Sequence, residues 1–435
     1  MQPSPPKILI VTFGSYGDLF PFVALGLALQ REGFRVVVAT SATHREIVLR
    51  EGLEFAAMRP DLDDVTRLLG LDLGGLARAM SADDGFLFQK VIFPFLRDSF
   101  DDVCAAAEGA VAIVAHAIAF AAHAAAETLE LPLFVTHLSP ALHYSPNDPP
   151  QSAPFIAAPQ GRFARAYNRA ALGVLARVAC LWAAPLRRFR RGLGLPERAP
   201  FALFAGVAPS VHRLGLHSPL LLRDGDADVV GHTFFDRGPE QAAEEARALE
   251  AFLARGPAPI VFTLGSFVVR DRAAHHRACV DAALRLNQRA ILLADDDDAA
   301  RLRGGELPGT IHVSRYAPHG ALFGRARIIA HHGGVGTSGQ ALRAGKPQLV
   351  TPFLGDQSDN AARLARLGVA RVLPGKKLSV ERLTKELRAL LENEDFAGRA
   401  EAIGRCVARE GGAEAAAKRI VNALSVRARG LTPSS

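Results

Sequence analysis

An alternation of short apolar runs and helical patterns, repeated in both halves of the chain, most limits its possible folds. Near the N-terminus, the apolar run Lys7–Phe13 leads into a turn of glycine and serine, and a helical pattern then extends from about Pro21 to Glu32. Pro21 is expected in the first turn of that helix. Gly33 ends the pattern, and the β-branched run Arg35–Thr40 follows. This order predicts a βαβ unit whose parallel strands are buried on both faces.

Strand patterns of the same kind recur along the chain, with helical patterns between them. They cover Val111–Ala115, Leu133–Thr136, Ile260–Leu264, Ala290–Ala294, Ile311–Val313, Ile328–Ala330 and Gln348–Thr351. A last, alanine-rich helix is expected at about Ala413–Val426. We therefore predict the α/β class, with two facing Rossmann-like, doubly wound parallel-sheet domains and an interdomain cleft, where ligands bind at the carboxyl ends of the strands.

The domain boundaries follow from this alternation and from the length of 435 residues, which is typical of two or three domains. A polar stretch over residues 223–228 separates the two halves, so we place the junction directly after it. The expected parts are residues 1–228, residues 229–410, and a C-terminal helix and tail, 411–435, that packs back toward the N-terminal domain.

The positive charge of the chain is concentrated in one segment. The formal net charge is +7, and residues 160–191 contribute eight arginines and no acid, so the remainder sums to 7 − 8 = −1. A nucleic-acid-binding protein would usually spread basic residues over a recognition module, and no such motif is found, so nucleic acid is not an expected partner. Two interpretations of the segment stay open: a solvated helix face, or an interfacial helix in peripheral contact with an anionic membrane.

Three features favour a cytoplasmic location. The four cysteines lie far apart, which is typical of reduced thiols. The N-terminal residues run straight into the first strand pattern, without the apolar region and cleavage site of a signal peptide. No apolar stretch of about 18 residues lacks a charge, so a spanning helix is not expected. Peripheral contact with the inner face of the membrane remains compatible with the arginine-rich segment.

The segment from Tyr316 to Asn360 carries the most specific chemistry. Its strand pattern Ile328–Ala330 is followed by two histidines and a glycine-rich turn, and a helix is expected to begin near Thr337. Backbone N–H groups at a helix N-terminus attract phosphate, and glycines let the backbone approach it closely. We therefore expect this turn to bind a diphosphate, to which His332 donates a hydrogen bond.

This segment resembles the donor-binding signature of family 1 glycosyltransferases, which have the two-domain GT-B fold. The stretch Gly14–Phe22 and the Phe262–Ser266 turn resemble in particular the bacterial rhamnosyltransferases of rhamnolipid synthesis. The resemblance implies that the C-terminal domain binds a nucleotide-diphosphate sugar and that the N-terminal domain binds the acceptor. The implied donor-binding residues are Gly14, Ser15, Gly265, Ser266, Tyr316, Ala317, His319, His332, Gly334, Gly336, Thr337, Gln340, Asp356 and Gln357.

Individual positions carry implied roles. Tyr316 stands where the family has a tryptophan that stacks on the base, and His319 stands where it has a glutamine near the base and ribose. Asp356 and Gln357 are suited to hydrogen bonds with sugar hydroxyls. Gln340 replaces a glutamate that binds both ribose hydroxyls in plant members. A carboxylate gains most when two hydroxyls donate to it, and deoxyribose has lost one, so Gln340 favours a dTDP-sugar over a UDP-sugar.

The expected catalytic base is Asp18. Many family members have a histidine in a Gly-His-x-x-Pro turn, and Asp18 occupies the histidine position in the turn Gly17–Pro21. Glycosyl transfer needs a base that takes the acceptor proton while the acceptor oxygen attacks the anomeric carbon. The unperturbed pKa of a carboxyl is only about 4, and a partly desolvated site would raise it.

Other residues leave two interpretations open. Phe88 and Phe93 belong to a phenylalanine-rich stretch that is either ordinary core or the wall of an apolar acceptor pocket. His137, directly after a strand pattern, is the histidine best placed to line an acceptor site, and the histidines of this region lack metal-ligand spacing. The acidic run Asp295–Asp298 follows a strand and precedes a helix, so we interpret it as a helix cap and not as a metal site.

The resulting hypothesis is an inverting hexosyltransferase. It would move a hexosyl or 6-deoxyhexosyl group, rhamnose or glucose, from a dTDP- or UDP-sugar to a hydroxyl of a hydrophobic acceptor such as a hydroxy-fatty acid, polyketide or terpenoid. The resemblance implies direct displacement without metal or cofactor, because the helix N-terminus and His332 stabilise the leaving diphosphate. Two alternatives are a nucleotide-sugar epimerase of the same fold and a binding homologue without catalysis.

Overall fold

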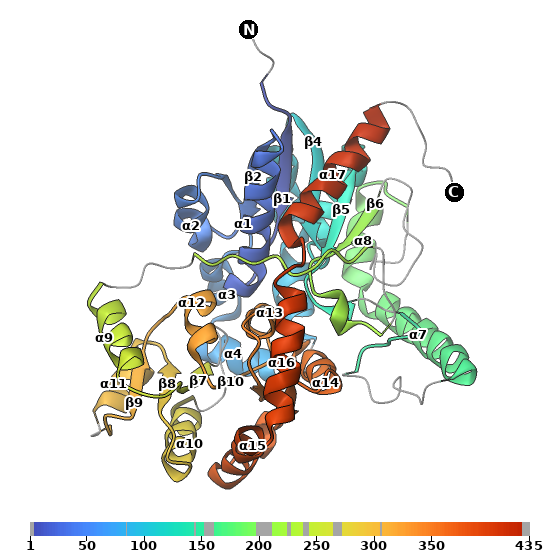
Figure 1. Cartoon of the computed structure of the whole chain (residues 1–435). Helices are drawn as coiled ribbons and strands as arrows, with labels where there is room; N and C mark the ends of the chain where they lie inside the picture. Colours follow the sequence, from blue (N-terminus) through green and yellow to red (C-terminus); the bar gives the residue numbers. More distant parts are fainter. Residues whose placement is uncertain are drawn as a thin grey trace. The chain divides into compact units, whose positions relative to one another are not determined.

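The computed structural model describes residues 4–83, 85–142, 145–151, 161–196, 211–223, 228–237, 243–263, 272–304 and 307–428 (Figure 1). The chain divides into two compact units. Unit 1 consists of Met1–Leu73, Gly85–Phe235 and Glu410–Ser435, and unit 2 consists of Gly74–Asp84 and Asp236–Arg409. The long pieces therefore meet at 235/236, a few residues after the junction expected from the sequence. A parallel bridge between Gly215 and Val229 ties the start of this connection to the first sheet.

Unit 1 is built on a six-stranded sheet in which every neighbouring pair of strands is parallel. In spatial order the strands are β3 (Glu54–Ala57), β2 (Arg35–Thr40), β1 (Lys7–Val11), β4 (Ala110–His116), β5 (Leu133–His137) and β6 (Val211–Gly215). Leu9 and Val11 belong to the core on one face, and Ile8 and Ile10 are also fully buried. Such a strand, covered on both faces, needs the continuous apolar run that the sequence shows.

The helices of unit 1 cover this sheet. They are α1 (Tyr16–Arg31), α2 (Arg45–Arg50), α3 (Leu62–Leu69), α5 (Leu96–Ala106), α6 (Phe120–Thr128), α7 (Arg162–Trp182), α8 (Ala184–Gly192) and α17 (Gly412–Ala428). The last helix, α17, packs against α1, and an ion pair of 2.7 Å joins Arg31 to Glu414.

Helix α1 begins earlier than the sequence pattern predicted. Ser15 is the N-cap, and a capping box with Asp18 starts the helix at Tyr16, so Pro21 lies inside the helix and not in its first turn. The capping box satisfies two backbone N–H groups at this end and therefore fixes the start more strongly than the proline does. Asp18 is thereby held directly after the carboxyl end of β1.

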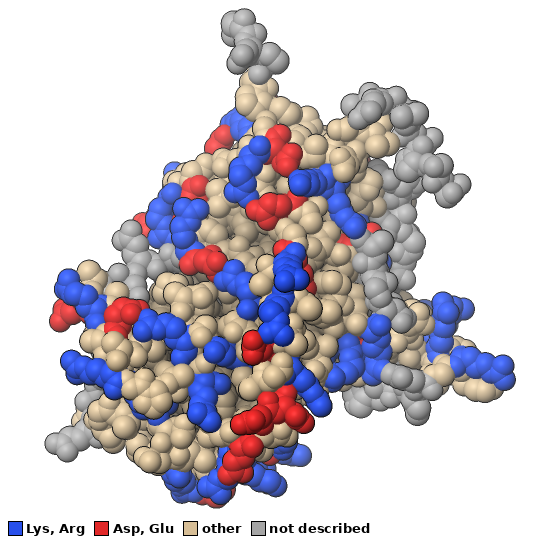
Figure 2. Space-filling model, viewed as in Figure 1, with Lys and Arg blue, Asp and Glu red and all other residues tan. Residues whose placement is uncertain are grey.

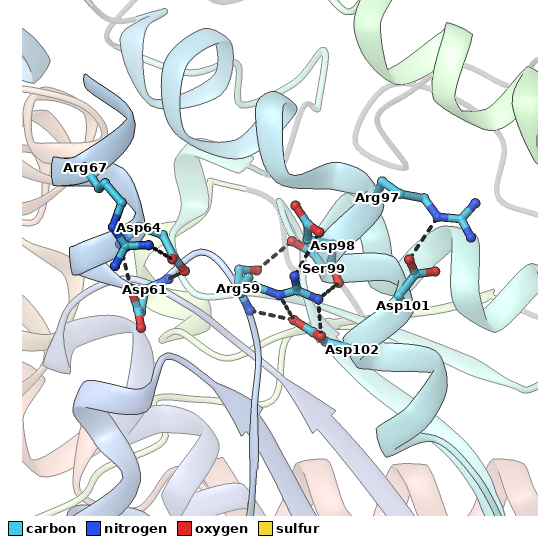
Figure 3. Close-up of polar contacts among 9 residues, drawn as sticks. All are labelled: Arg59, Asp61, Asp64, Arg67, Arg97, Asp98, Ser99, Asp101 and Asp102. Carbon is cyan, nitrogen blue, oxygen red and sulfur yellow. Dashed lines mark hydrogen bonds and ion pairs between the residues drawn. The ribbon is translucent and has the colours of Figure 1, made fainter. Parts of the chain in front are cut away.

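A group of arginine and aspartate side chains holds the chain after β3 against α5 (Figure 3). Arg59 donates to Asp98 at 2.9 Å and to both carboxylate oxygens of Asp102, at 2.9 and 2.7 Å. Burial alone would raise the pKa of Asp102, but the hydrogen bonds from Arg59 outweigh it and lower that pKa. A second capping box, between Asp61 and Asp64, starts α3 close by.

Unit 2 repeats the architecture with a second parallel six-stranded sheet. Its strands, in spatial order, are β12 (Ala370–Val372), β11 (Gln348–Val350), β10 (Ile328–His331), β7 (Ile260–Thr263), β8 (Ala290–Leu293) and β9 (Ile311–Ser314). Its helices are α4 (Leu73–Ala82), α9 (Ala243–Ala254), α10 (Arg272–Arg285), α11 (Asp296–Arg303), α12 (His319–Leu322), α13 (Val335–Arg343), α14 (Gln357–Arg366), α15 (Val380–Glu392) and α16 (Glu394–Val407). Ile260 and Phe262 lie in one core and Val261 in another, so helices cover both faces.

The strand order reverses at one point in each sheet. In unit 1 the reversal lies between β1 and β4, and in unit 2 between β7 and β10. Chain connections leave to opposite sides there, and open α/β sheets bind ligands outside the carboxyl ends of the strands at such points. The two predicted site segments follow β1 and β10 and therefore lie at these two points.

Candidate functional site

Asp18 lies at the switch point of unit 1, within the first turn of α1. Its Oδ2 atom accepts hydrogen bonds from the backbone N–H of Ser15 at 2.9 Å and from the Ser15 hydroxyl at 3.1 Å. Burial raises the pKa of Asp18, and the two hydrogen bonds from Ser15 oppose this only in part. The side chain nevertheless keeps 37% of its surface exposed. A carboxylate with a raised pKa and an open side is a stronger base than an ordinary aspartate and remains accessible to a hydroxyl.

His116, at the end of β4, faces the other carboxylate oxygen. Its Nε2 atom lies 3.9 Å from Asp18 Oδ1, too far for a hydrogen bond but within reach of a small movement. Its Nδ1 atom accepts a hydrogen bond from the backbone N–H of Ile118 at 3.3 Å, which leaves Nε2 to carry the proton. Burial lowers the pKa of His116 to about 4, so the ring is neutral at physiological pH. The sequence contains His116 but no motif that pairs it with Asp18.

Aromatic side chains surround the first turn of α1. Tyr16 stacks on Phe20 with a centroid distance of 5.2 Å and lies 5.6 Å from the ring of His44. His44 Nε2 hydrogen bonds to the carbonyl oxygen of Gly14 at 2.9 Å and thereby braces the turn that precedes the helix. Gly14 has a φ of 114°, a conformation that favours glycine, and a Cβ atom there would overlap the Asp18 carboxylate. Gly14 and Ser15 thus hold Asp18 in place.

The three predicted acceptor residues also lie in unit 1. Phe88 and Phe93 both contact Trp182, with centroid distances of 4.9 and 5.5 Å. Phe93 is 6% exposed and part of the core, which favours the core interpretation for this residue, whereas Phe88 is partly buried against it. His137 ends β5, the strand beside His116, and is buried. Trp182, which joins the two phenylalanines, was not singled out from the sequence.

In unit 2, the predicted diphosphate turn follows β10 as expected. His331 accepts at Nδ1 from the backbone N–H of Gly333 at 3.1 Å and therefore donates from Nε2 to Gln348 Oε1 at 2.9 Å. Asn360 donates from its amide to the carbonyl oxygen of Gly333 at 2.9 Å and to Asp356 Oδ2 at 2.9 Å. These bonds fix the shape of the turn from within the protein, and Asn360 had no role assigned from the sequence.

His332 and the start of α13 form the part of this turn available to a ligand. Burial lowers the pKa of His332 to about 3, so its ring is neutral and can donate without bringing charge. Gly334 is the N-cap of α13 and provides no side-chain cap, and Thr337 is buried in the helix behind it. A Cβ atom on Gly334 would lie 2.3 Å from His332 Nε2, so only glycine leaves room for the ring. Gly336 lies in the first turn of the same helix.

The remaining donor residues of unit 2 lie around this turn. Gln357 is buried, and its Oε1 atom accepts from the backbone N–H groups of Phe353 and Leu354 at 2.9 and 3.2 Å. Ala317 is buried in the core. His319 stacks on Phe323 at 4.5 Å, and burial lowers its pKa to about 4.

Three further predicted donor positions are Tyr316, Gly265 and Ser266, of which the structure describes only Tyr316. Tyr316 accepts at its backbone oxygen from the Ser314 hydroxyl at 3.1 Å. Gly265 and Ser266 lie outside the described residues.

Gln340 is already engaged within unit 2. Its amide nitrogen donates to Asp236 Oδ1 at 3.2 Å, and its amide oxygen accepts from Arg343 Nη2 at 2.7 Å. Arg343 also pairs with Asp236. Burial would raise the pKa of Asp236, but the bonds from Arg343 and Gln340 lower it, so its negative charge is maintained. A ribose contact by Gln340 would compete with these two bonds.

Metal-binding clusters are absent from the described part of the chain, where no group of three or more histidine, cysteine or acidic side chains is arranged to hold an ion. The acidic run after β8 serves as a cap, as predicted, because Asp295 accepts from the backbone N–H of Asp298 at 3.0 Å at the start of α11.

Comparison with known proteins identifies the family. Residues 8–143 match the glycosyltransferase family 28 N-terminal domain, and residues 277–425 match the C-terminal domain of erythromycin biosynthesis protein CIII-like proteins. The chain is 31% identical to O-mycaminosyltylonolide 6-deoxyallosyltransferase of Streptomyces fradiae, and the alignment covers 98% of this chain and 100% of that protein. The chain belongs to the family 28/EryCIII-like glycosyltransferases.

Further relatives place this EryCIII-like glycosyltransferase among enzymes of two kinds. It is 29% identical to sterol 3-beta-glucosyltransferase ATG26 of Gibberella zeae over 94% of this chain, but it spans only 29% of that longer protein. Its fold is similar to that of the kitacinnamycin glycotransferase, with a TM-score of 0.70 and 20% identity over 97% of this chain and 100% of that one. VinC, solved with dTDP, has a TM-score of 0.68 and 20% identity over 96% and 99% of the two chains.

These matches confirm the GT-B fold of the EryCIII-like glycosyltransferase, with one parallel six-stranded sheet in each unit. They support the resemblance drawn from the sequence at the level of the glycosyltransferase family. The relatives are macrolide and sterol glycosyltransferases and do not single out the rhamnosyltransferases of rhamnolipid synthesis. The matched stretches also carry the family 28 and CIII-like descriptions, where the sequence pattern suggested family 1.

Proposed function

We propose that this glycosyltransferase moves a hexosyl or 6-deoxyhexosyl group from a nucleotide-diphosphate sugar to a hydroxyl of a hydrophobic acceptor, with inversion at the anomeric carbon. The observation that carries the proposal is Asp18, which is held at the switch point of unit 1 with one carboxylate oxygen toward His116. An enzyme that abstracts a proton from an alcohol needs such a group, whereas a binding protein does not.

In the proposed reaction, Asp18 takes the hydroxyl proton as the acceptor oxygen attacks the anomeric carbon. The bond from that carbon to the diphosphate oxygen breaks, and its electron pair leaves with the diphosphate. The uncapped N–H groups of α13 and the neutral His332 would stabilise the charge that develops there. Neither metal nor cofactor is required by this scheme, since fixed dipoles meet the leaving group.

For the donor, we favour a dTDP-sugar over a UDP-sugar. Relatives of the same fold have been solved with dTDP, and Gln340 stands where a ribose-binding glutamate would otherwise be. The sugar is proposed to be rhamnose or glucose. The S. fradiae relative is named for 6-deoxyallose, which supports the 6-deoxyhexose class.

For the acceptor, we favour a polyketide or terpenoid alcohol, with a hydroxy-fatty acid as the further candidate. The relatives are named for a macrolide and for sterols, both bulky apolar molecules that carry hydroxyl groups. The partly buried Phe88 and its neighbour Trp182 offer apolar surface in unit 1. We propose a cytoplasmic location, where nucleotide sugars are available.

The test is a donor and acceptor panel read by mass spectrometry. dTDP- and UDP-linked glucose and rhamnose are combined with a macrolide aglycone, a sterol and a 3-hydroxy fatty acid, and glycosylated acceptor is expected with at least one dTDP donor. An isomerised donor in the absence of acceptor would instead support the epimerase alternative. Failure to bind dTDP or UDP, together with no product, would support a non-catalytic homologue.

The role of Asp18 is tested by D18N in the same assay. We expect kcat to fall by about 100-fold or more, because amide nitrogen and oxygen do not accept the acceptor proton, while the Kd for dTDP stays unchanged. The matched control is D64N, because Asp64 has the same capping-box position in α3 and accepts from the N-cap N–H at 3.1 Å. Equal turnover in D18N and wild type, or an equal loss in D64N, would contradict the assignment.

A further inference from the structure

Helix α7 exposes a row of large apolar side chains. Five of them are between 52% and 78% exposed: Phe163, Tyr167, Val174, Val178 and Leu181. Successive members are four, seven, four and three residues apart. These spacings keep side chains on one side of an α-helix, so the five form a continuous line, the α7 stripe.

Another side of the same helix attaches it to unit 1. Asn168 and Leu172 are buried, and the Asn168 amide donates to the carbonyl oxygen of Pro146 at 3.0 Å. The two buried positions fall between stripe positions along the sequence and are about a quarter of a turn or more away around the helix. The helix is thus held by one side, and the α7 stripe lies on a separate, solvent-facing side.

The exposed charged side chains of α7 are all positive. Arg162, Arg165, Arg169 and Arg177 of α7 are all exposed, and residues 161–196 contain no acidic residue. Among the described residues, none of these four arginines has an acidic partner within ion-pair distance. Lys and Arg atoms gather at the outer part of the α7 region without Asp or Glu atoms among them (Figure 2).

Arg190 of α8 shows the contrasting case. It is buried, and it pairs with Glu127 at 2.6 Å and with the carbonyl oxygen of Pro196. This arginine therefore has a structural role inside unit 1. The four α7 arginines have no acidic partner among the described residues. Cationic side chains that lie near one another without acids repel each other, and an external anionic surface would offset this Coulomb energy.

We propose that α7 docks unit 1 onto an anionic lipid surface, with the α7 stripe in the headgroup region and Arg162 and Arg177 on lipid phosphates. These two arginines border the stripe: the Arg162 guanidinium lies over the Phe163 ring at 5.2 Å, and Arg177 is four residues before Leu181. An exposed apolar line bordered by cations is the pattern of helices that lie in a membrane interface, where arginine stems follow the apolar surface while the guanidinium groups reach phosphate. The charge complementarity favours anionic lipid over a protein surface, which would need acids placed to match these arginines.

In this proposal α7 lies on the membrane surface and does not span the membrane. No single helix in the described residues is long and apolar enough to cross a membrane, and α7 and α8 meet the length and hydropathy requirement only as a pair bent by 62°. The docking proposal does not depend on the catalytic proposal, since it concerns a surface and not the reaction.

The test uses the full chain and vesicle flotation. Vesicles of phosphatidylcholine alone are compared with vesicles that also contain phosphatidylglycerol, at low and at high salt. Wild type is expected to float with the anionic vesicles at low salt, about tenfold more than with neutral ones, and to be released by salt. R162Q/R177Q and F163S/L181S should each lower the bound fraction about tenfold.

Matched controls remove the same chemistry elsewhere. L68S removes an apolar side chain of α3 that is 53% exposed, and R327Q/R388Q removes two exposed arginines of unit 2. Both controls should float like wild type, and circular dichroism checks that all variants fold. The proposal is overturned if wild type does not bind at low salt, if the controls lose binding equally, or if F163S/L181S only converts a dimer into a monomer.

Discussion

Asp18 combines a structural and a proposed chemical task on two different oxygen atoms. Oδ2 closes the capping box with Ser15, and Oδ1 points toward His116. The first task fixes the carboxylate in space, because the α1 start and the Gly14 turn both depend on it. The second task needs the remaining oxygen to be free for a proton. A base positioned by a helix cap loses little side-chain entropy when it reacts, since the cap has already ordered it.

His116 is predicted to tune Asp18 without carrying charge. In H116N the amide can replace Nδ1 toward Ile118 but leaves nothing in the place of Nε2, whereas H116Q places an amide nitrogen there. Loss of the N–H dipole should raise the pKa of Asp18 further, because that dipole favours the carboxylate. The acid limb of the kcat/KM profile should therefore move up by about half a pH unit or more in H116N.

H116Q is the control for that experiment, and the acid limb of its kcat/KM profile should coincide with that of the wild type. A purely structural role would lower activity by a constant factor at every pH. Parallel profiles for wild type and H116N would therefore refute the tuning role, even if H116N were less active.

Gln340 gives a second prediction at the same scale. Its side chain is held by Asp236 and Arg343, so D236A, which removes the acceptor of its amide nitrogen, should leave that nitrogen free for a bound nucleotide. We expect D236A to change the ratio of Kd values for dTDP and UDP by about threefold or more, a small effect because one hydrogen bond is exchanged for another. Isothermal titration calorimetry with the free nucleotides measures it. An unchanged ratio together with a strong wild-type preference for UDP would reject any role of Gln340 in ribose selection.

At the scale of the element, the N-terminus of α13 needs a residue without a Cβ atom at Gly334, beside the His332 ring. Gly334 has φ −58° and ψ 141°, which alanine also adopts, so only the space beside His332 requires glycine. G334A should push the His332 ring away and weaken dTDP binding about tenfold, while the fold is retained. The control is G324A, because a Cβ atom at Gly324 meets nothing within 4 Å. Equal dTDP affinities in the two variants would show that the ring position does not matter.

The strands show what the sequence could predict. Of the twelve strands in the described part of the chain, nine were predicted to within two residues, because most of these runs are apolar and buried on both faces. The three that were missed, β3, β6 and β12, all lie at an edge of a sheet. An edge strand pairs on one side only and can be short or polar, as the run Val-His-Arg-Leu-Gly of β6 is. Its sequence therefore carries little of the pattern that marks a central strand.

The candidate site divides in the same way. The position of the glycine-rich turn could be predicted because its residues follow one another between β10 and α13. The approach of His116 to Asp18 could not, because the two residues are 98 positions apart and meet only through the pairing of β1 with β4. Similarly, nothing near Gln340 in the sequence indicates that Asp236 holds it.

For the whole molecule, buried neutral histidines predict a loss of stability in mild acid. Burial lowers the pKa to about 4 for four of them and to about 3 for the fifth: His116, His123, His319, His331 and His332. Unfolding returns each to a pKa of about 6.5, so the unfolded chain binds more protons between about pH 6.5 and 4. The stabilisation is complete above pH 6.5 and is lost as the pH falls through this window.

Urea unfolding at several pH values measures this effect. Each extra proton bound by the unfolded chain contributes a slope of about 1.4 kcal/mol per pH unit, so the midpoint should fall steeply from pH 6.5 to 5 and change little from pH 8 to 7. A midpoint that stays constant down to pH 5 would show that these histidines are protonated in the folded protein.

The return of α17 to unit 1 determines how this protein can be recombined with its relatives. Ala416, Ala417 and Ile420 are fully buried, and the helix packs against α1, so its partner is encoded almost 400 residues earlier. A chimera made by one crossover at the central junction would join the α1 of one parent to the α17 of the other. Two crossovers, near 235/236 and 409/410, would instead exchange residues 236–409, which are all of unit 2 except Gly74–Asp84, and keep both helices from the same parent.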